Sequence, residues 1–234
     1  MKILEFSDNH IHDDSHLREN LELQIRIAME KPNIVVIKGD FTDEWEAPIE
    51  AIRLTETYRS WQATLETLAT IYGVTIYRIP GNHDPDPIKG DFPHVTVVRK
   101  LVFHYPIDVE IRHGHEFDVI WSGVWVIPGI SGLAFFFMDH FPTMARKLRS
   151  ILHAFGKKTP RDKKGSYAQD WTENVGRIHN RARKHAQKTG RAMSIGHTHC
   201  PFCDGLVIDS GDMEDSFSYD IIEGSGTTIK KLVG

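Results

Sequence analysis

The stretch IVVIKGDFTD, residues 34–43, joins an apolar run to a cluster of carboxylates. Four consecutive β-branched residues are typical of a buried strand, and the glycine after Lys38 predicts a turn out of it. Four other stretches have the same form: ILEFSDNH (residues 3–10), VTIYRIPGNHD (74–84), DVEIRHGH (108–115) and AMSIGHTH (192–199). Each predicts a strand that ends in a loop of polar residues able to bind a metal.

The order of the expected elements indicates an α/β fold. Helices are predicted from about residue 16 to 31 and from about 48 to 72, between the first three strands. A β-α-β-α-β order favours a sheet with crossover helices, and the carboxyl ends of its strands meet at one edge. Adjacent strands are expected over residues 95–115. Helical spacing begins at about residue 141, GKKTPRDKKG (residues 156–165) is expected to be a mobile basic loop, and a second helix is expected over residues 166–188. A β-meander is expected at the end of the chain.

Composition and charge indicate a soluble enzyme. The chain of 234 residues has 40 % hydrophobic and 26 % charged residues, with no signal peptide predicted at its start. Its longest nearly apolar run, residues 123–138, is too short and too broken for a membrane span. Two cysteines in one loop suit a reducing compartment, so a cytoplasmic location is expected.

The charge is unevenly distributed. Residues 146–191 carry 14 Lys/Arg and 3 Asp/Glu, a net charge of +11 in a chain of net charge −4. Such a segment indicates either an anionic partner or a solvated helical face.

Eight side chains at the predicted strand ends can bind metal. In an extended segment, residues i and i+2 point to the same side, so Asp8 with His10 and His197 with His199 could each direct two ligands to one point. Carboxylate, imidazole and amide ligands without thiolate suit Mn, Fe, Ni or Zn. Two such ions about 3.5–4 Å apart form a centre suited to phosphoester hydrolysis. The eight residues are Asp8, His10, Asp40, Asn82, His83, His113, His197 and His199.

These five motifs resemble those of the calcineurin-like metallophosphoesterases. They are D-x-H, G-D-x-x-D, G-N-H-D, H-G-H and G-H-T-H, and the resemblance extends from residue 1 to about 211. It implies a β-sandwich core flanked by helices, forming one metallophosphoesterase domain over residues 1–234. Residues 134–190 are expected to be a helical, basic lid insertion within that domain.

The resemblance also implies roles for the site residues. Asp8, His10, Asp40 and His199 would hold one metal ion, and Asp40 would bridge to a second ion held by Asn82, His113 and His197. His83 would contact the phosphate and protonate the leaving oxygen, with Asp84 fixing its orientation. Asp43 and Asp84 have a second interpretation, as acceptors for backbone amides in their turns. His115 is expected at the periphery of the site or on the surface.

Within the superfamily, the chain looks closest to the UDP-2,3-diacylglucosamine hydrolase-like branch. His197 follows His113 by 84 positions, and the intervening segment holds a Phe-rich and then basic stretch that resembles the lid of those lipid pyrophosphatases. DSGDMEDSFSYDII (residues 209–222) resembles the S-G-D-W segment of the branch, with Met213 in place of Trp. His83 stands where the best-known members carry Arg.

The predicted function is hydrolysis of a phosphodiester or pyrophosphate bond by a metal-bound hydroxide, on a substrate such as a UDP-diacylglucosamine-like nucleotide-lipid. The expected cofactors are two divalent ions, most readily Mn, with Fe, Zn and Ni as alternatives. The expected partner is an anionic phosphoester, with peripheral membrane or lipid contact through the lid.

Three other functions remain open: a nuclease, which would use the basic segment on nucleic acid; a cyclic-nucleotide phosphodiesterase; and a non-catalytic scaffold. Cys200 and Cys203 are assigned to the rim of the pocket as unpaired thiols, because a structural zinc would need further ligands at suitable spacing.

Overall fold

The structure, a computed structural model, describes residues 1–84, 91–118, 167–213, 216–224 and 226–232. It consists of two compact units. One unit comprises Met1–His115 with Ala182–Gly234, and the other comprises Glu116–Arg181. The first unit contains both sheets and all the candidate ligands.

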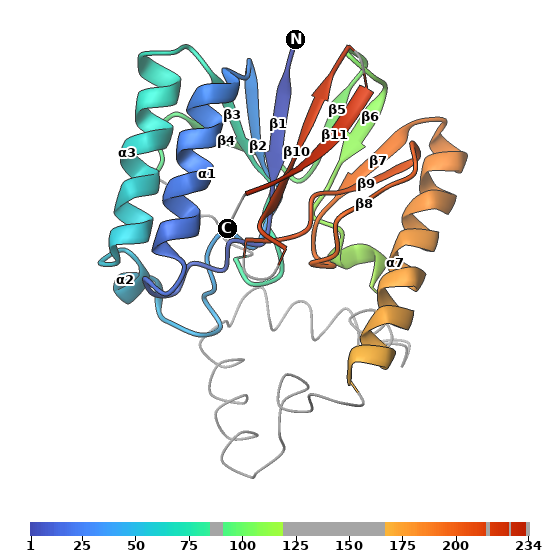
Figure 1. The fold of residues 1–234 in the computed structure, drawn as a ribbon, viewed down its shortest axis with the longest axis horizontal. Coiled ribbons are helices and arrows are strands. Elements are labelled where there is room, and N and C mark those ends of the chain that lie inside the picture. Colours follow the sequence, from blue (N-terminus) through green and yellow to red (C-terminus); the bar gives the residue numbers. More distant parts are fainter. Residues whose placement is uncertain (85–90, 119–166, 214–215, 225, 233–234) are drawn as a thin grey trace. The chain divides into compact units, whose positions relative to one another are not determined.

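The first sheet has six described strands in the order β11-β10-β1-β2-β3-β4 (Figure 1). Strands β1 to β4 are parallel to one another, and β10 is antiparallel to both β1 and β11. Parallel neighbours require crossover connections, as the β-α-β-α-β order predicted. The strands are β1 (Ile3–Phe6), β2 (Ile34–Ile37), β3 (Thr75–Arg78), β4 (Val95–Val97), β10 (Ser218–Glu223) and β11 (Gly226–Lys231).

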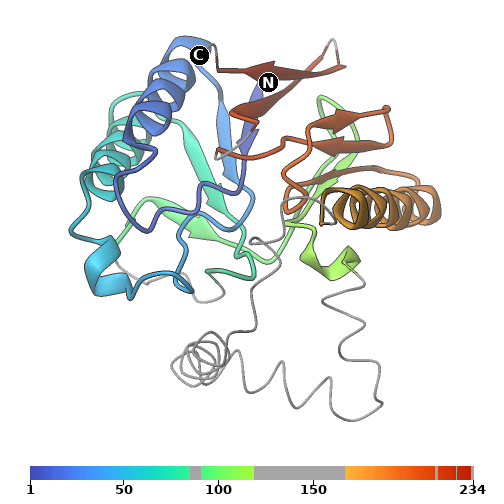
Figure 2. The same ribbon diagram turned by 60° about the horizontal axis from the view of Figure 1, so that its bottom comes forward.

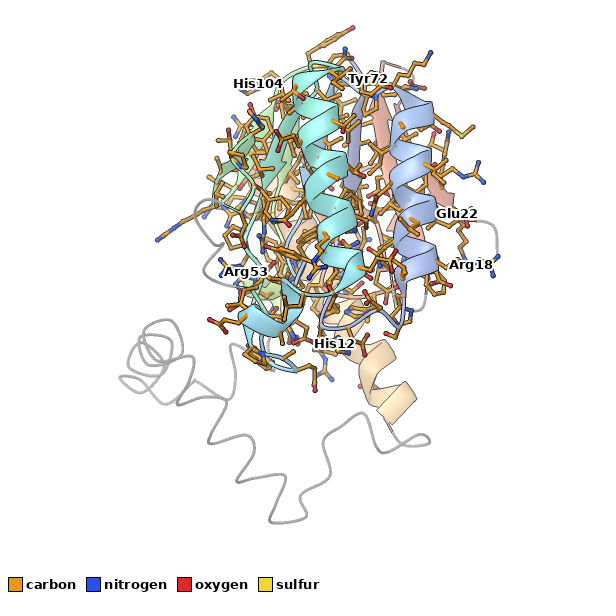
Figure 3. The ribbon with its side chains drawn as sticks, turned by 90° about the vertical axis from the view of Figure 1, so that its left-hand side faces the viewer. His12, Arg18, Glu22, Arg53, Tyr72 and His104 are labelled. Carbon is orange, nitrogen blue, oxygen red and sulfur yellow. The ribbon has the colours of Figure 1, made fainter. Side chains whose placement is uncertain are left out.

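Helices α1 (Leu17–Glu30) and α3 (Glu56–Thr70) cover one face of this sheet. The single helix expected over residues 48–72 is divided, because a short helix, α2 (Ile49–Ile52), precedes α3. Thr55 has extended backbone angles and its side chain accepts a hydrogen bond from the Tyr58 amide, so it caps α3 and breaks the helix there. Arg18 and Glu22 extend from the outer side of α1 (Figure 3).

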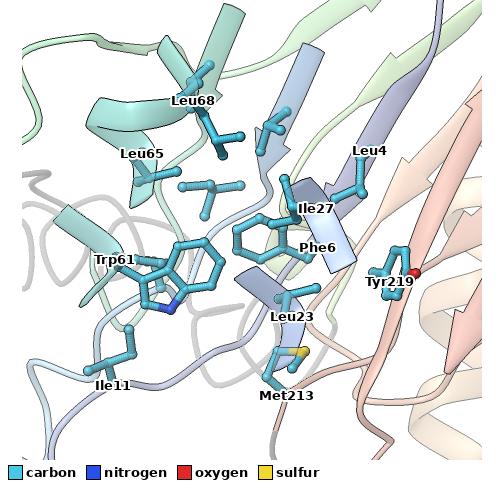
Figure 4. Close-up of a cluster of buried hydrophobic side chains, with 14 of the residues drawn as sticks. Leu4, Phe6, Ile11, Leu23, Ile27, Trp61, Leu65, Leu68, Met213 and Tyr219 are labelled. Carbon is cyan, nitrogen blue, oxygen red and sulfur yellow. The ribbon is translucent and has the colours of Figure 1, made fainter. Parts of the chain in front are cut away.

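The core between these helices and the sheet is built around two aromatic rings (Figure 4). Phe6 of β1 stacks on Trp61 of α3, with ring centroids 5.1 Å apart. Leu23 and Ile27 of α1 are fully buried beside them. The helical apolar spacing read from the sequence therefore faces the sheet.

The second sheet has five described strands in the order β5-β6-β7-β9-β8. A second apolar cluster joins residues of β1, β2 and β10 to residues of β6 and β9, so the two sheets pack face to face. This confirms the expected β-sandwich core. The strands are β5 (Leu101–Phe103), β6 (Val109–Ile111), β7 (Ala192–Ile195), β8 (Phe202–Cys203) and β9 (Val207–Asp209).

The expected C-terminal meander is wrong. Strand β9 pairs in parallel with β7 in the second sheet, whereas β10 and β11 form a hairpin in the first. The chain changes sheets between them, where Gly211 and Phe217 have left-handed backbone angles (φ 76° and 46°). Alternating polarity marks strands but does not specify which sheet they join.

Helix α7 (Tyr167–Thr189) agrees with the helix expected up to residue 188. Its residues 182–189, which belong to the first unit, lie beside the second sheet (Figures 1 and 2). A short 3-10 turn, His115–Phe117, follows β6. Most of the lid expected over residues 134–190, including the Phe-rich stretch, lies outside the described residues. Among the described helices, none is long and apolar enough to cross a membrane.

A buried charge network links the two sheets. Lys38 follows β2, is fully buried, and its Nζ lies 3.2 Å from both Glu5 Oε2 and Asp220 Oδ2. The same ammonium donates to Ser194 Oγ (3.0 Å) and to the Ile195 carbonyl (2.9 Å) of β7. Breaking such a pair typically costs about 3–5 kcal/mol, because the remaining charge stays buried without a partner.

Carboxylates outnumber ammonium groups in this network. Burial lowers the pKa of Lys38, but the nearby carboxylates outweigh it and raise that pKa above its ordinary value. Burial, opposed by Lys38, raises the pKa of Asp220 to about 7, and Glu5 adds like-charge repulsion. Between about pH 4 and pH 7, the folded protein therefore favours a proton on Asp220 that the unfolded chain would release.

We expect this proton to make stability depend on pH. The pKa of Asp220 in the folded protein exceeds its ordinary value of 3.8. Protonation of Asp220 therefore contributes fully to the free energy of unfolding at low pH, and this contribution is lost as the pH rises toward about 7. The free energy of unfolding of the wild type, relative to Asp220→Asn, should fall by up to about 1.4 kcal/mol per pH unit across this window. Urea unfolding at several pH values tests this, with the exposed Glu50→Gln as control; a pH-independent difference would contradict it.

Candidate metal centre

The candidate ligands follow the carboxyl ends of five strands. Asp8 and His10 come after β1, and Asp40 comes after β2. Asn82 follows β3, with the candidate proton donor His83 and Asp84 directly after it. His113 follows β6, and His197 and His199 follow β7. Because β6 and β7 belong to the second sheet, the centre lies where the ends of both sheets meet.

Five of the seven candidate ligands have a left-handed backbone conformation. The φ angles of this group lie between 46° and 70°: Asp8, His10, Asp40, His197 and His199. The pairs Asp8–His10 and His197–His199 therefore converge through tight turns and not through the extended geometry expected from the sequence. Left-handed angles cost non-glycine residues about 1 kcal/mol or more each, and such strain clusters at functional sites.

Hydrogen bonds between loops hold these turns. The amides of Asp8 and His10 donate to the carbonyls of Gly39 (3.1 Å) and Asp40 (2.9 Å), so the loops after β1 and β2 pair with each other. Asp8 Oδ2 accepts from the His197 amide at 2.9 Å. The loop after β7 is thereby attached to the loop after β1.

Glycines allow the loops to approach this closely. A Cβ atom on Gly81 would clash with the carboxylate and amide of Asp40, and one on Gly196 would lie 2.7 Å from Asp8 Oδ2. These are the first residues of the G-N-H-D and G-H-T-H motifs. Their role is to leave room for the two central carboxylates.

The first group of ligand atoms surrounds Asp8 Oδ1. His199 Nε2 lies 3.7 Å and His10 Nε2 3.9 Å from this oxygen. His10 Nε2 is also 3.9 Å from Asp40 Oδ2. The structure thus brings together the four residues expected to hold one ion.

The second group shares Asp40. His113 Nε2 lies 3.2 Å from Asp40 Oδ2 and 3.2 Å from Asn82 Oδ1. One ligand atom each from Asp40, His113 and His197 lies within 4.8 Å of the others. Asp40 therefore belongs to both groups, which is the position of a bridging carboxylate.

The residues fit two divalent cations. Asp8 Oδ1 and His10 Nε2 are buried and have no hydrogen-bond partner in the described part of the chain. An unsatisfied buried polar group costs about 1–3 kcal/mol, and a cation between these atoms would satisfy both. The donor set of carboxylates, imidazoles and one amide suits Mn, Fe, Ni or Zn.

His83 is held by Asp43. Its Nδ1 lies 2.9 Å from Asp43 Oδ1, and its amide donates to Asp40 Oδ1 at 2.8 Å. The other oxygen of Asp43 lies 3.3 Å from His10 Nδ1. One carboxylate thus orients both a candidate ligand and the candidate proton donor.

Asp84 does not orient the His83 side chain as expected. Its fully buried carboxylate accepts from the amides of Asp40 (3.1 Å), Phe41 (2.8 Å) and Gly81 (2.7 Å) and from Arg78 (2.6 Å). These bonds join the loops after β2 and β3. Asp84 therefore fixes the backbone that carries Asp40, which is its second interpretation from the sequence, and the orienting role for His83 belongs to Asp43.

Two further residues orient candidate ligands and were not assigned from the sequence. Asp212 Oδ2 lies 2.6 Å from His199 Nδ1, and the carbonyl of Lys38 lies 2.7 Å from His113 Nδ1. Such partners fix the ring orientation of metal-binding histidines. The aspartate of the S-G-D segment could have indicated the role of Asp212, whereas the contact from the Lys38 carbonyl has no sequence signal because every residue has a carbonyl. The ring of His115 lies 5.3 Å from that of His113, at the periphery of the second group.

The electrostatics fit a site prepared for cations. Burial raises the pKa of Asp40, but His113, His83 and His10 outweigh it and hold that pKa well below its usual range. Burial lowers the pKa of His113, but Asp40 opposes this and raises it to about 10. For His83, burial is likewise outweighed by Asp40 and Asp43, and its pKa is raised.

The fold and the two ligand groups define a metal-dependent phosphoesterase. Residues 1–203 match the profile of the calcineurin-like phosphoesterase family, and the chain belongs to that family. No curated protein matches the sequence.

Two phosphoesterases are among the solved structures that resemble the chain. One is a novel archaeal phosphodiesterase, with a TM-score of 0.50 and 13 % identity over 99 % of this chain and all of that one. The other is Yfce, a phosphoesterase from E. coli, with a TM-score of 0.46 and 14 % identity over 99 % of this chain and 93 % of that one. The first shows that the fold is shared.

We expect metal binding to compete with a proton on His113. Without a cation, Nε2 of this ring faces Asp40 and Nδ1 faces the Lys38 carbonyl, and the raised pKa of the ring favours a proton on both nitrogens. A bound cation requires Nε2 to be free of its proton. Between pH 7 and 8.5, where ordinary histidines are neutral, the apparent Mn²⁺ affinity should rise about tenfold per pH unit. Calorimetric titration in two buffers of different ionisation enthalpy measures both the Mn²⁺ affinity and the number of protons released on binding. Constant affinity without proton release would contradict it.

Proposed function

We propose that this phosphoesterase uses two divalent cations to hydrolyse a phosphodiester or pyrophosphate bond. The observation that carries the proposal is the convergence of two ligand groups on Asp40 with His83 beside them. When bound, the cations would supply a nucleophile from water at neutral pH and neutralise charge on the phosphate. Asp8, His10, Asp40 and His199 would hold one ion, and Asn82, His113 and His197 would join Asp40 in holding the other.

His83 serves as the proton donor in this proposal. Because Asp43 is hydrogen-bonded to Nδ1 of His83, Nε2 is the ring nitrogen that can face a substrate. The His83 side chain is 22 % exposed. As the bond from phosphorus to the leaving oxygen breaks, that oxygen takes the Nε2 proton. Asp40 and Asp43 outweigh burial and raise the pKa of His83, which favours the protonated ring that a general acid requires.

The proposed substrate class is a nucleotide-linked diphosphate, with a UDP-diacylglucosamine-like lipid as the first candidate. The long insertion after His113 and the S-G-D segment that contains Asp212 support this branch of the superfamily. The best-known members of this branch carry arginine at the position of His83. The assay described below therefore compares a nucleotide-lipid with another diester.

Substitution at Asp40 and His83 should separate binding from chemistry. Asp40→Ala should lose metal and activity together, because both ligand groups share its carboxylate. His83→Ala should keep two ions per chain but lose about 10²–10⁴-fold in kcat, the usual contribution of a general acid. Metal analysis measures the number of bound ions, and hydrolysis of phenyl phosphodiesters measures kcat. The exposed His94→Ala is the control.

Two results would contradict these roles. Loss of metal from His83→Ala would make this residue a ligand, which its distance from His10 and Asp40 permits. Retention of both ions and of activity by Asp40→Ala would remove the bridging role.

A parallel assay should identify the substrate class. UDP-diacylglucosamine and single-stranded DNA are offered to the Mn²⁺-loaded enzyme, and ³¹P NMR in ¹⁸O-water shows which phosphorus is attacked. Cleavage of the nucleotide-lipid between its two phosphates is the expected result. Cleavage of DNA alone would indicate a nuclease, and turnover of neither by a metal-loaded protein would favour a non-catalytic scaffold.

A further inference from the structure

A tryptophan lies against the candidate proton donor. The indole of Trp45 stacks on the imidazole of His83, with ring centroids 4.5 Å apart and an angle of 24° between the planes. Trp45 is half-buried and follows the G-D-x-x-D motif by two residues. It has no role in the ligand groups described above.

The same carboxylate holds both partners of this stack. Asp43 Oδ1 accepts from the Trp45 amide at 3.0 Å, and it lies 2.9 Å from His83 Nδ1. The loop that places the indole is therefore attached to the atom that holds the imidazole. The two rings are fixed relative to each other.

A single hydrogen bond does not fix a ring. The bond from Nδ1 to Asp43 sets one point of the imidazole but allows the ring to pivot about it. The stacked indole restricts that rotation from a ring face, and the imidazole of His10, perpendicular at 89° and 4.6 Å away, restricts it further. With both contacts in place, the direction of Nε2 is determined.

We infer that Trp45 is a positioning residue that keeps Nε2 of His83 directed at the leaving oxygen. This inference rests on the proton-donor role proposed for His83. Positioning of this kind changes the rate of the step in which the proton moves and leaves substrate affinity unchanged. It matters most for leaving groups that cannot depart without a proton.

The test compares two leaving groups in one series of variants. The substrates are a p-nitrophenyl and a phenyl diester of the same phosphate, because p-nitrophenolate departs readily whereas phenolate requires protonation. For Trp45→Ala, kcat should fall about tenfold for the phenyl ester and little for the p-nitrophenyl ester, with KM unchanged. Trp45→Phe should restore most of the activity, since a flat ring can still stack.

Two readouts show that the variant is folded and that the ring contact exists. Metal content of Trp45→Ala should match that of the wild type, and its thermal unfolding should remain cooperative, with a midpoint only a few degrees lower. In NMR spectra, the imidazole proton of His83 between its nitrogens should lie upfield in the wild type because of the indole ring current. It should move downfield in Trp45→Ala, and His83→Ala provides its assignment.

Each other result overturns the inference. An equal loss for both esters would indicate a general structural role, and a rise in KM alone would indicate direct contact with substrate. If His83→Ala itself shows no preference between leaving groups, the proton-donor role fails and the positioning role fails with it. If His83→Ala shows the preference but Trp45→Ala does not, only the inference about Trp45 is wrong.

Discussion

The carboxylate of Asp40 is the point on which the rest of the site depends. Its Oδ2 lies 3.2 Å from His113 and 3.9 Å from His10, so it belongs to both ligand groups, while Oδ1 accepts the His83 amide. Its own amide is held by Asp84. A carboxylate in this position links the two groups to the proposed proton donor through one side chain, and it explains why neighbouring loops pack so closely around it.

The surrounding structure supports this arrangement at a cost in stability. Left-handed backbone angles at five candidate ligands and the buried charges beneath them are unfavourable in isolation. They persist because hydrogen bonds between the loops and to the Asp84 carboxylate hold the strained backbone. The ion pairs of Lys38 satisfy the buried charges. Lys38 contributes both to the fold and to the site, because its ammonium group links the two sheets while its carbonyl orients His113.

The sequence predicted the architecture and which residues lie together at the strand ends, but not how their side chains are oriented. Buried apolar runs that end in polar loops identified β1, β2, β3, β6 and β7, because burial leaves a local pattern. The sheet joined by β9 and the break before α3 depend on tertiary pairing and on one cap at Thr55, which periodicity does not record. The exchange of roles between Asp43 and Asp84 likewise depends on which loop lies beside His83, a fact of three-dimensional packing.

The central claim is that one carboxylate joins two cation sites, and anomalous diffraction from crystals soaked in Mn²⁺ tests it most directly. The account predicts two anomalous peaks about 3.5–4 Å apart, one on either side of Asp40, with His10 and His199 beside one peak and His113 and His197 beside the other. A single peak that Asp40 does not contact, or none with these histidines in place, would contradict it.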